Sequence, residues 1–114
     1  MGGYAVNKGN RNPYQPEDPQ GADDCDLSFT VDLVGVQPEI TSSLSFGDEL
    51  LVTLKTNGAV TSVVCADERG EVAGTLAAFR GLARLIGCLR QGESYVAVVQ
   101  AASPTRCMVF VRRR

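Results

Sequence analysis

The spacing of hydrophobic residues changes twice between positions 70 and 99, and these changes predict three consecutive elements. A short strand-like run covers Glu71–Leu76. Apolar residues then recur at the spacing of a helix over Leu76–Arg90 and alternate with other residues over Glu93–Gln100, after a break at Gly92. This stretch therefore predicts a strand, a helix and a second strand.

Similar alternation predicts three more strands upstream and one near the C-terminus. The upstream strands cover Leu27–Leu33, Glu49–Lys55 and Ala59–Ala66. The second and third of these are joined at Asn57-Gly58, a dipeptide that strongly favours a hairpin turn. The last run, Arg106–Arg112, is apolar on both faces, so we expect this strand to be central or to close a barrel.

Six strands and one helix predict a mainly β fold. We expect a six-stranded, mostly antiparallel small barrel or curved sheet, with the helix between the fourth and fifth strands plugging an open end. The apolar face of each element supplies the predicted core, which consists of Phe29, Val31, Leu50, Val52, Val63, Leu76, Phe79, Ile86, Tyr95 and Val109.

Residues 1–26 differ in composition from the rest of the chain. They contain Pro13, Pro16 and Pro19 and few large apolar side chains, so they cannot bury enough surface to offset the entropy lost on ordering. We expect a flexible tail over residues 1–26 and one folded domain over residues 27–114. The alternative is a polyproline-like ligand segment anchored by Tyr14.

The net charge of −2 conceals a strong asymmetry along the chain. Residues 1–26 carry two basic and five acidic groups, residues 27–68 carry one and six, and residues 69–114 carry eight and two. One explanation is that acidic and basic strands pair across the sheet. The other is a surface that binds phosphate, because all eight late basic residues are arginine. The candidate nucleic-acid-binding residues are Arg80, Arg84, Arg112, Arg113 and Arg114.

The residues offer little catalytic chemistry. The chain has no histidine, which removes the usual general base and the commonest metal ligand. Asp67-Glu68 is typical of a solvated turn, and the pair Gly70 and Gly74 lacks the Lys-Ser/Thr of a phosphate-binding loop. We therefore predict no enzyme activity, no catalytic residue and no cofactor.

Four cysteines, Cys25, Cys65, Cys88 and Cys107, lie far apart in the sequence and form no Cys-x-x-Cys pair. Cys65, Cys88 and Cys107 lie within or beside apolar runs, so we expect inert buried thiols rather than zinc ligands or disulfides. Acidic neighbours disfavour the thiolate form of Cys25, which makes it a poor nucleophile. No metal site is predicted.

The order of these elements and several residues within them resembles the HIRAN domain, a small barrel found beside helicases and nucleases and also alone in bacteria. The matching residues are Gly47, Asp48, Leu50, Ala59, Val60, Gly70, Gly74, Leu76, Gly92, Tyr95, Ala97 and Val99. The resemblance implies binding of DNA ends. Asn57-Gly58 stands where family members usually carry Asn-x-x-Asp, and no ligand residue is transferred by motif.

No feature of the sequence indicates a membrane or export. No apolar run approaches the roughly 20 residues that a membrane span requires. The first residues, Met1–Tyr4, have neither a basic head followed by an apolar stretch nor a cleavage site, and Val6 stands where a myristoylation signal needs Ser or Thr. We expect a cytoplasmic protein without a membrane partner.

Two functions of different classes remain. The first is a module that binds DNA ends or single-stranded nucleic acid through the five candidate arginines, although a sequence pI near 5.0 counts against it. The second is a protein-interaction module, such as an inhibitor or accessory protein of a bacterial or phage conflict system. Its support is the small size, the sparse catalytic chemistry and the acidic segments, which could meet a basic partner.

Overall fold

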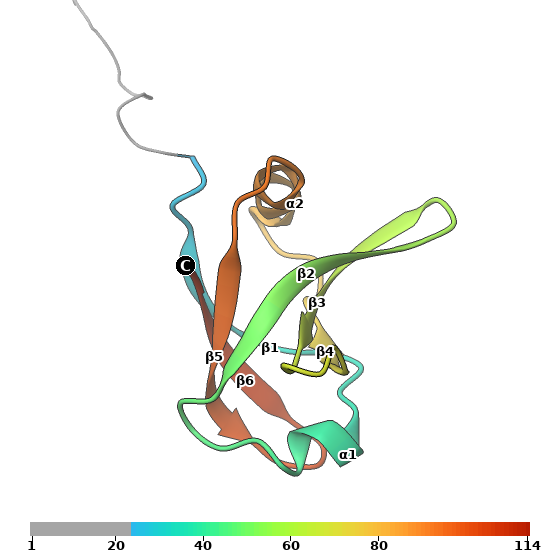
Figure 1. Ribbon diagram of the computed structural model, residues 1–114, viewed down its shortest axis with the longest axis vertical. Coiled ribbons are helices and arrows are strands. Elements are labelled where there is room, and N and C mark those ends of the chain that lie inside the picture. Colours follow the sequence, from blue (N-terminus) through green and yellow to red (C-terminus); the bar gives the residue numbers. More distant parts are fainter. Residues whose placement is uncertain (1–23) are drawn as a thin grey trace, which may run out of the picture.

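The computed structural model describes residues 24–114, and Figure 1 shows how the elements in this range are arranged. Most of the predicted tail, residues 1–23, lies outside the described residues, so the tail stays a prediction. The elements are β1 (Ser28–Asp32), α1 (Pro38–Thr41), β2 (Glu49–Asn57), β3 (Val60–Ala66), β4 (Val72–Thr75), α2 (Leu82–Arg90), β5 (Tyr95–Ala102) and β6 (Cys107–Arg113). The predicted mainly β fold, with a helix between the fourth and fifth strands, is confirmed.

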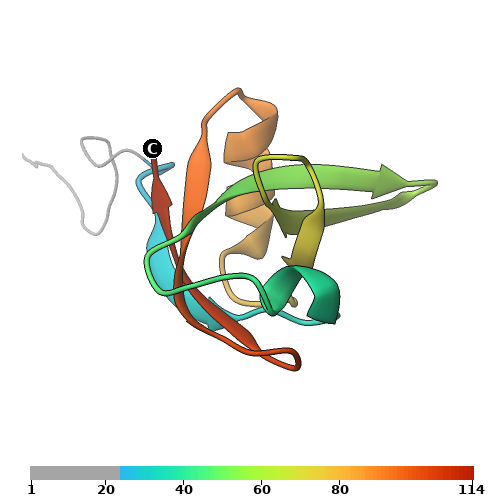
Figure 2. The ribbon, with the colours of Figure 1, turned by 60° about the horizontal axis from the view of Figure 1, so that its bottom comes forward.

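Within residues 24–114 the six strands form one antiparallel sheet in the order β1-β6-β5-β2-β3-β4. β6 lies between β1 and β5, as its two apolar faces indicate. The sheet curves strongly, so its edge strands approach each other (Figure 2). Just after β1, Val34 exchanges two backbone hydrogen bonds with Thr75 of β4, of 2.8 and 2.9 Å. The result is a strongly curved sheet and not a closed barrel.

The core fills the inner side of this sheet. Six of the ten predicted core residues are buried: Leu50, Val52, Val63, Leu76, Tyr95 and Val109. The other four, Phe29, Val31, Phe79 and Ile86, are half-buried and pack against the same core. Phe29 and Val31 belong to the edge strand β1, Ile86 belongs to α2, and Phe79 lies in the segment before α2.

Helix α2 is shorter than predicted, because it begins at Leu82 and not at Leu76. The Leu76 N–H donates to the carbonyl of Val63 at 2.9 Å, which keeps this part of the chain beside the sheet. Gly81 then adopts a left-handed conformation with φ of +103°, which glycine tolerates well, immediately before the helix. Phe79 nevertheless reaches the core from the non-helical segment before α2, and its ring centroid lies 4.7 Å from that of Phe29.

The short helix α1 lies between β1 and β2, where no helix is predicted. Pro38 stands at its first turn, where a missing N–H costs nothing and the fixed φ suits a helix. Ile40 and Thr41 are buried, and the Thr41 hydroxyl donates to the carbonyl of Gln37 at 3.3 Å. α1 therefore covers the core beside β4.

The prediction of buried free thiols is confirmed for Cys65 and Cys107 and is wrong for Cys88. Cys65 and Cys107 are buried free thiols. Cys25 and Cys88 form a disulfide, with their Cα atoms 5.6 Å apart and a sequence separation of 63. The sequence could not show this pair, because only folding brings the segment before β1 beside α2. No helix in the described residues is long and apolar enough to cross a membrane.

Candidate binding groove

The five candidate arginines do not form one cluster around α2. Arg80 and Arg84 are exposed and lie just before and within the first turn of the helix. The C-terminal arginines lie near the loop that follows the helix, because the Arg114 N–H donates to the carbonyl of Ser94 at 2.9 Å. A helix of nine residues is about 13 Å long, so the two groups are set near opposite ends of α2.

Two of the three terminal arginines are occupied by ion pairs. Arg113 bonds to Glu93 through two nitrogens, at 3.0 and 2.5 Å. Arg112 lies 3.6 Å from Glu49. In the part of the chain that the structure describes, Arg80, Arg84 and Arg114 form no ion pair. Fewer positive charges are therefore free for phosphate than the sequence suggests.

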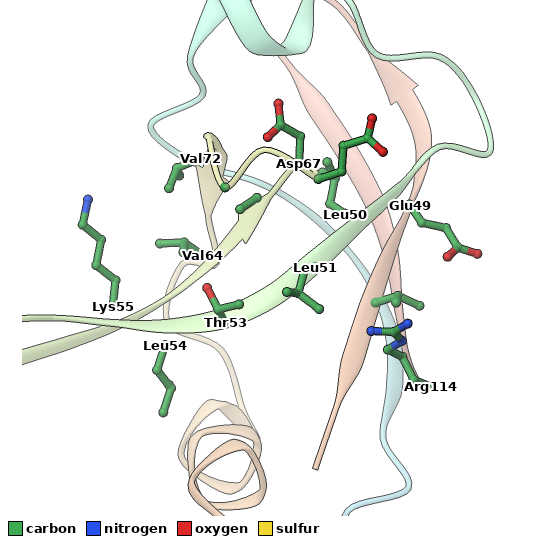
Figure 3. Close-up of a pocket in the computed structure, with 14 residues that line it drawn as sticks. Glu49, Leu50, Leu51, Thr53, Leu54, Lys55, Val64, Asp67, Val72 and Arg114 are labelled. Atoms are coloured by element: carbon green, nitrogen blue, oxygen red, sulfur yellow. The ribbon is translucent and has the colours of Figure 1, made fainter. Parts of the chain in front are cut away.

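A groove crosses the outer face of β2, β3 and β4 (Figure 3). It consists of two hollows of about 790 and 760 Å³, which share Lys55, Val64 and Val72. A third hollow of about 470 Å³ adjoins the first through Glu49, Leu50, Asp67 and Glu68. We name these three hollows together the β2–β4 groove.

The floor of the first hollow is largely apolar, whereas the second and third hollows are lined mainly by polar residues. Alternate residues of a strand point to opposite faces, so β2 directs Leu51 and Lys55 to the groove, while Leu54 points toward α2 (Figure 3). Neighbouring strands add the buried side chains of Val64 and Val96. Leu51 is 42 % exposed and Val60, in the second hollow, is 63 % exposed. Apolar surface at these two positions is open to a partner.

Acidic residues concentrate at one end of the groove. Asp48, Glu49, Asp67 and Glu68 line the third hollow, against a single basic residue, Arg69. Beside this end, Phe46 is 77 % exposed two residues before Asp48. We call this region, made of Phe46, Asp48, Glu49, Asp67 and Glu68, the acidic end. Lys55 lies away from it, in the part common to the two larger hollows.

The geometry of the turn after β3 keeps Asp67 ionised. Its carboxylate accepts the backbone N–H groups of Glu71 at 2.9 Å and Arg69 at 3.0 Å. The hydrogen bond from the Glu71 N–H lowers the pKa of Asp67 most, and burial acts in the opposite direction. The Arg69 N–H and the positive Arg69 guanidinium lower this pKa further. Asp67 is thus a structural turn residue as well as part of the acidic end, in line with the solvated turn that the sequence predicts.

Sequence reasoning missed this groove, although the sequence holds a signal for it. The alternating pattern of β2 places Leu50, Val52 and Leu54 on one face of the strand. Leu51 is an apolar residue on the opposite face. The run Val63–Ala66 is apolar without interruption, which is typical of a strand covered on both faces. Both observations indicate apolar surface on the outside of the sheet.

The described residues contain no group of three or more His, Cys, Asp or Glu side chains placed to hold a metal ion. Comparison of the chain with protein-family models, with curated proteins and with solved structures finds no match.

Proposed function

We propose that this protein is a non-catalytic module that binds an extended segment of a protein partner in the β2–β4 groove. The observation that carries the proposal is the apolar floor beside an acidic end. Burial of Leu51 and Val60 would supply the hydrophobic contribution to binding, and the acidic end would orient a basic side chain of the partner. A small inhibitor or accessory protein of a bacterial or phage conflict system, acting in the cytoplasm, would work in this way.

The test uses synthetic peptides of defined charge. A labelled ten-residue peptide with alternating valines and two arginines at one end is compared by fluorescence anisotropy with the same peptide carrying glutamates in place of the arginines. We expect the arginine peptide to bind at least about tenfold more tightly, which corresponds to about 1.4 kcal/mol.

Two variants locate the binding surface. Leu51→Asp should abolish binding, because it places a charge on the apolar floor. Thr30→Asp adds the same charge on β1, at the far edge of the sheet, and should leave binding unchanged. Equal affinity for the two peptides, or equal binding by the two variants, would contradict the proposal.

Nucleic-acid binding remains a second candidate, supported by the HIRAN resemblance and by the exposed Arg80 and Arg84, which have no ion pair within residues 24–114. If these arginines contact phosphate, binding of labelled single-stranded DNA should weaken steeply with added salt. Replacing both with serine should flatten the salt slope by roughly 0.7 for each phosphate that is no longer neutralised. No measurable binding at about 50 mM salt would exclude this candidate.

A further inference from the structure

The Cys25–Cys88 disulfide links the segment before β1 to α2, two parts of the chain that are far apart in sequence. Cys25 precedes β1, and Cys88 lies in the last turn of α2. Cys25 is 7 % exposed and Cys88 is 3 % exposed. The bond is therefore enclosed by the protein and is not a surface link.

Besides the disulfide, helix α2 is held by its apolar side chains, with Leu85 in the core and Leu82, Ile86 and Leu89 packed against it. It has nine residues, contains Gly87, and has no side-chain cap at its N-terminus. Isolated helices shorter than about 12 residues are marginal in water, and an internal glycine weakens them further. Leu85 anchors α2 in the core, and Arg90 donates to the Thr61 hydroxyl at 3.3 Å. The disulfide holds the turn that follows Leu85.

Cys25 is also fixed to the sheet. The hydroxyl of the fully buried Tyr95, at the start of β5, donates a hydrogen bond to the Cys25 carbonyl. The disulfide thus connects α2, through Cys25, to an internal strand of the sheet. Movement of α2 away from the sheet requires either this bond to break or the segment before β1 to move with the helix.

The interior of the sheet does not depend on this connection. Leu50, Val63, Val99, Val109 and Val111 are each at most 1 % exposed and lie on β2, β3, β5 and β6, which are joined by backbone hydrogen bonds. We expect these strands to remain paired when α2 is released.

We propose that the Cys25–Cys88 disulfide is a redox-controlled clamp, which fixes α2 over the open side of the sheet when formed and lets α2 detach when reduced. A dithiol reductant supplies the electrons: one of its thiolates attacks one sulfur of the disulfide and forms a mixed disulfide, and its second thiolate then displaces the protein sulfur. Two electrons and two protons pass to Cys25 and Cys88, and the reductant becomes a disulfide.

The redox state of the compartment decides whether Cys25 and Cys88 form the disulfide or are reduced to thiols. Reducing pools in the cytoplasm keep most thiols reduced, whereas exported proteins retain disulfides. In the cytoplasm that the sequence predicts, the clamp would open under ordinary conditions and close under oxidation. The clamp and the β2–β4 groove have separate tests, because hydrogen exchange of α2 reports on the clamp and peptide binding reports on the groove.

The clamp is tested by hydrogen exchange, measured by mass spectrometry on the full chain with and without dithiothreitol. Reduction should raise exchange of the α2 amides Leu85–Gln91 at least about tenfold, while amides of β2 and β5 change by less than about twofold. Alkylation with N-ethylmaleimide should label Cys25 and Cys88 only after reduction.

Two variants make the result specific. Cys25→Ala/Cys88→Ala should show the exchange pattern of the reduced protein even without dithiothreitol. Cys107→Ala removes a buried free thiol, leaves the disulfide intact and should retain protection of α2. Equal protection of α2 in both redox states, joint loss of protection by α2 and the strands, or free thiols at Cys25 and Cys88 in the oxidised protein would each overturn the proposal.

Discussion

At the scale of single residues, the two free thiols illustrate how burial sets chemistry. Burial, with a smaller contribution from Cys107, raises the pKa of Cys65 to about 12. Burial and then the Asp32 carboxylate raise the pKa of Cys107. The thiolate is the reactive form of cysteine, so both residues are inert while the protein is folded.

This inertness can be measured by alkylation. At pH 8, iodoacetamide should leave Cys65 and Cys107 unmodified in the native protein and modify both in urea. Because their folded pKa is raised, both residues contribute stability below the unfolded pKa of about 8.5, and that contribution is lost as the pH rises through the folded pKa. Modification of native Cys65 at the rate found in urea would contradict the burial described.

Asp67 titrates in the opposite sense. Its folded pKa is lowered, first by the hydrogen bond from the Glu71 N–H. The carboxylate therefore stabilises the turn above the unfolded pKa of about 3.9, and this contribution is lost as the pH falls through the folded pKa. Thermal denaturation should show Asp67→Asn melting below the parent at pH 7, with the gap narrowing below about pH 3. A constant gap over that range would argue against the charge effect.

At the scale of elements, the turns follow local sequence and the contacts between elements do not. Asn57-Gly58 forms the predicted hairpin turn between β2 and β3, and Gly58 has a φ of +65°. Gly74, in β4, is a different case, because an added Cβ would lie 2.9 Å from the Leu33 Cβ. Only a residue without a side chain allows β4 to approach the segment just after β1, at Leu33 and Val34, so closely.

A pair of glycine substitutions separates these effects. Gly74→Ala should lower the free energy of unfolding by about 1–3 kcal/mol, since one of the two backbones must move. Gly87→Ala, on α2, meets no atom within 4 Å and should raise it by about 0.5–1 kcal/mol through helix propensity. Urea denaturation measures both, and a stable Gly74→Ala variant would show that the two backbones separate easily.

At the scale of the whole molecule, the charge asymmetry is partly resolved by pairing. Arg106 contacts both carboxylate oxygens of Asp32, at 3.1 and 3.0 Å, and Arg112 lies 3.6 Å from Glu49. Each pair joins the acidic part of the sequence to the basic part, as the pairing of strands across the sheet predicts. Within residues 24–114, Arg80, Arg84 and Arg114 remain exposed and without an ion pair.

These cross-strand ion pairs should contribute little stability. Both partners of the Arg106–Asp32 pair are more than half exposed, and pairs of this kind contribute about 0.2–1 kcal/mol. Arg106→Ala should therefore lower the melting temperature by no more than a few degrees, as measured by circular dichroism. A larger decrease would mean that Arg106 supports the turn between β5 and β6 in another way.

Much of the fold could be predicted from the sequence because its signals are local. Alternation identified all six strands to within a few residues, since a strand with one buried face must place apolar residues at every second position. The predicted helix was wrong at Leu76 and Phe79, because a non-helical segment before α2 carries both side chains into the same core. Periodicity reports which side chains are buried and not which backbone conformation buries them.

The sequence by itself determined the strands, the hairpin turn at Asn57-Gly58 and most of the core. Only the tertiary structure decided that Cys25 meets Cys88, that Arg112 and Arg113 are paired with carboxylates, and that Leu51 and Val60 lie along one groove. The physical reason is that these contacts join residues distant in the chain. Their proximity depends on the order and curvature of the strands, which no local pattern of residues encodes.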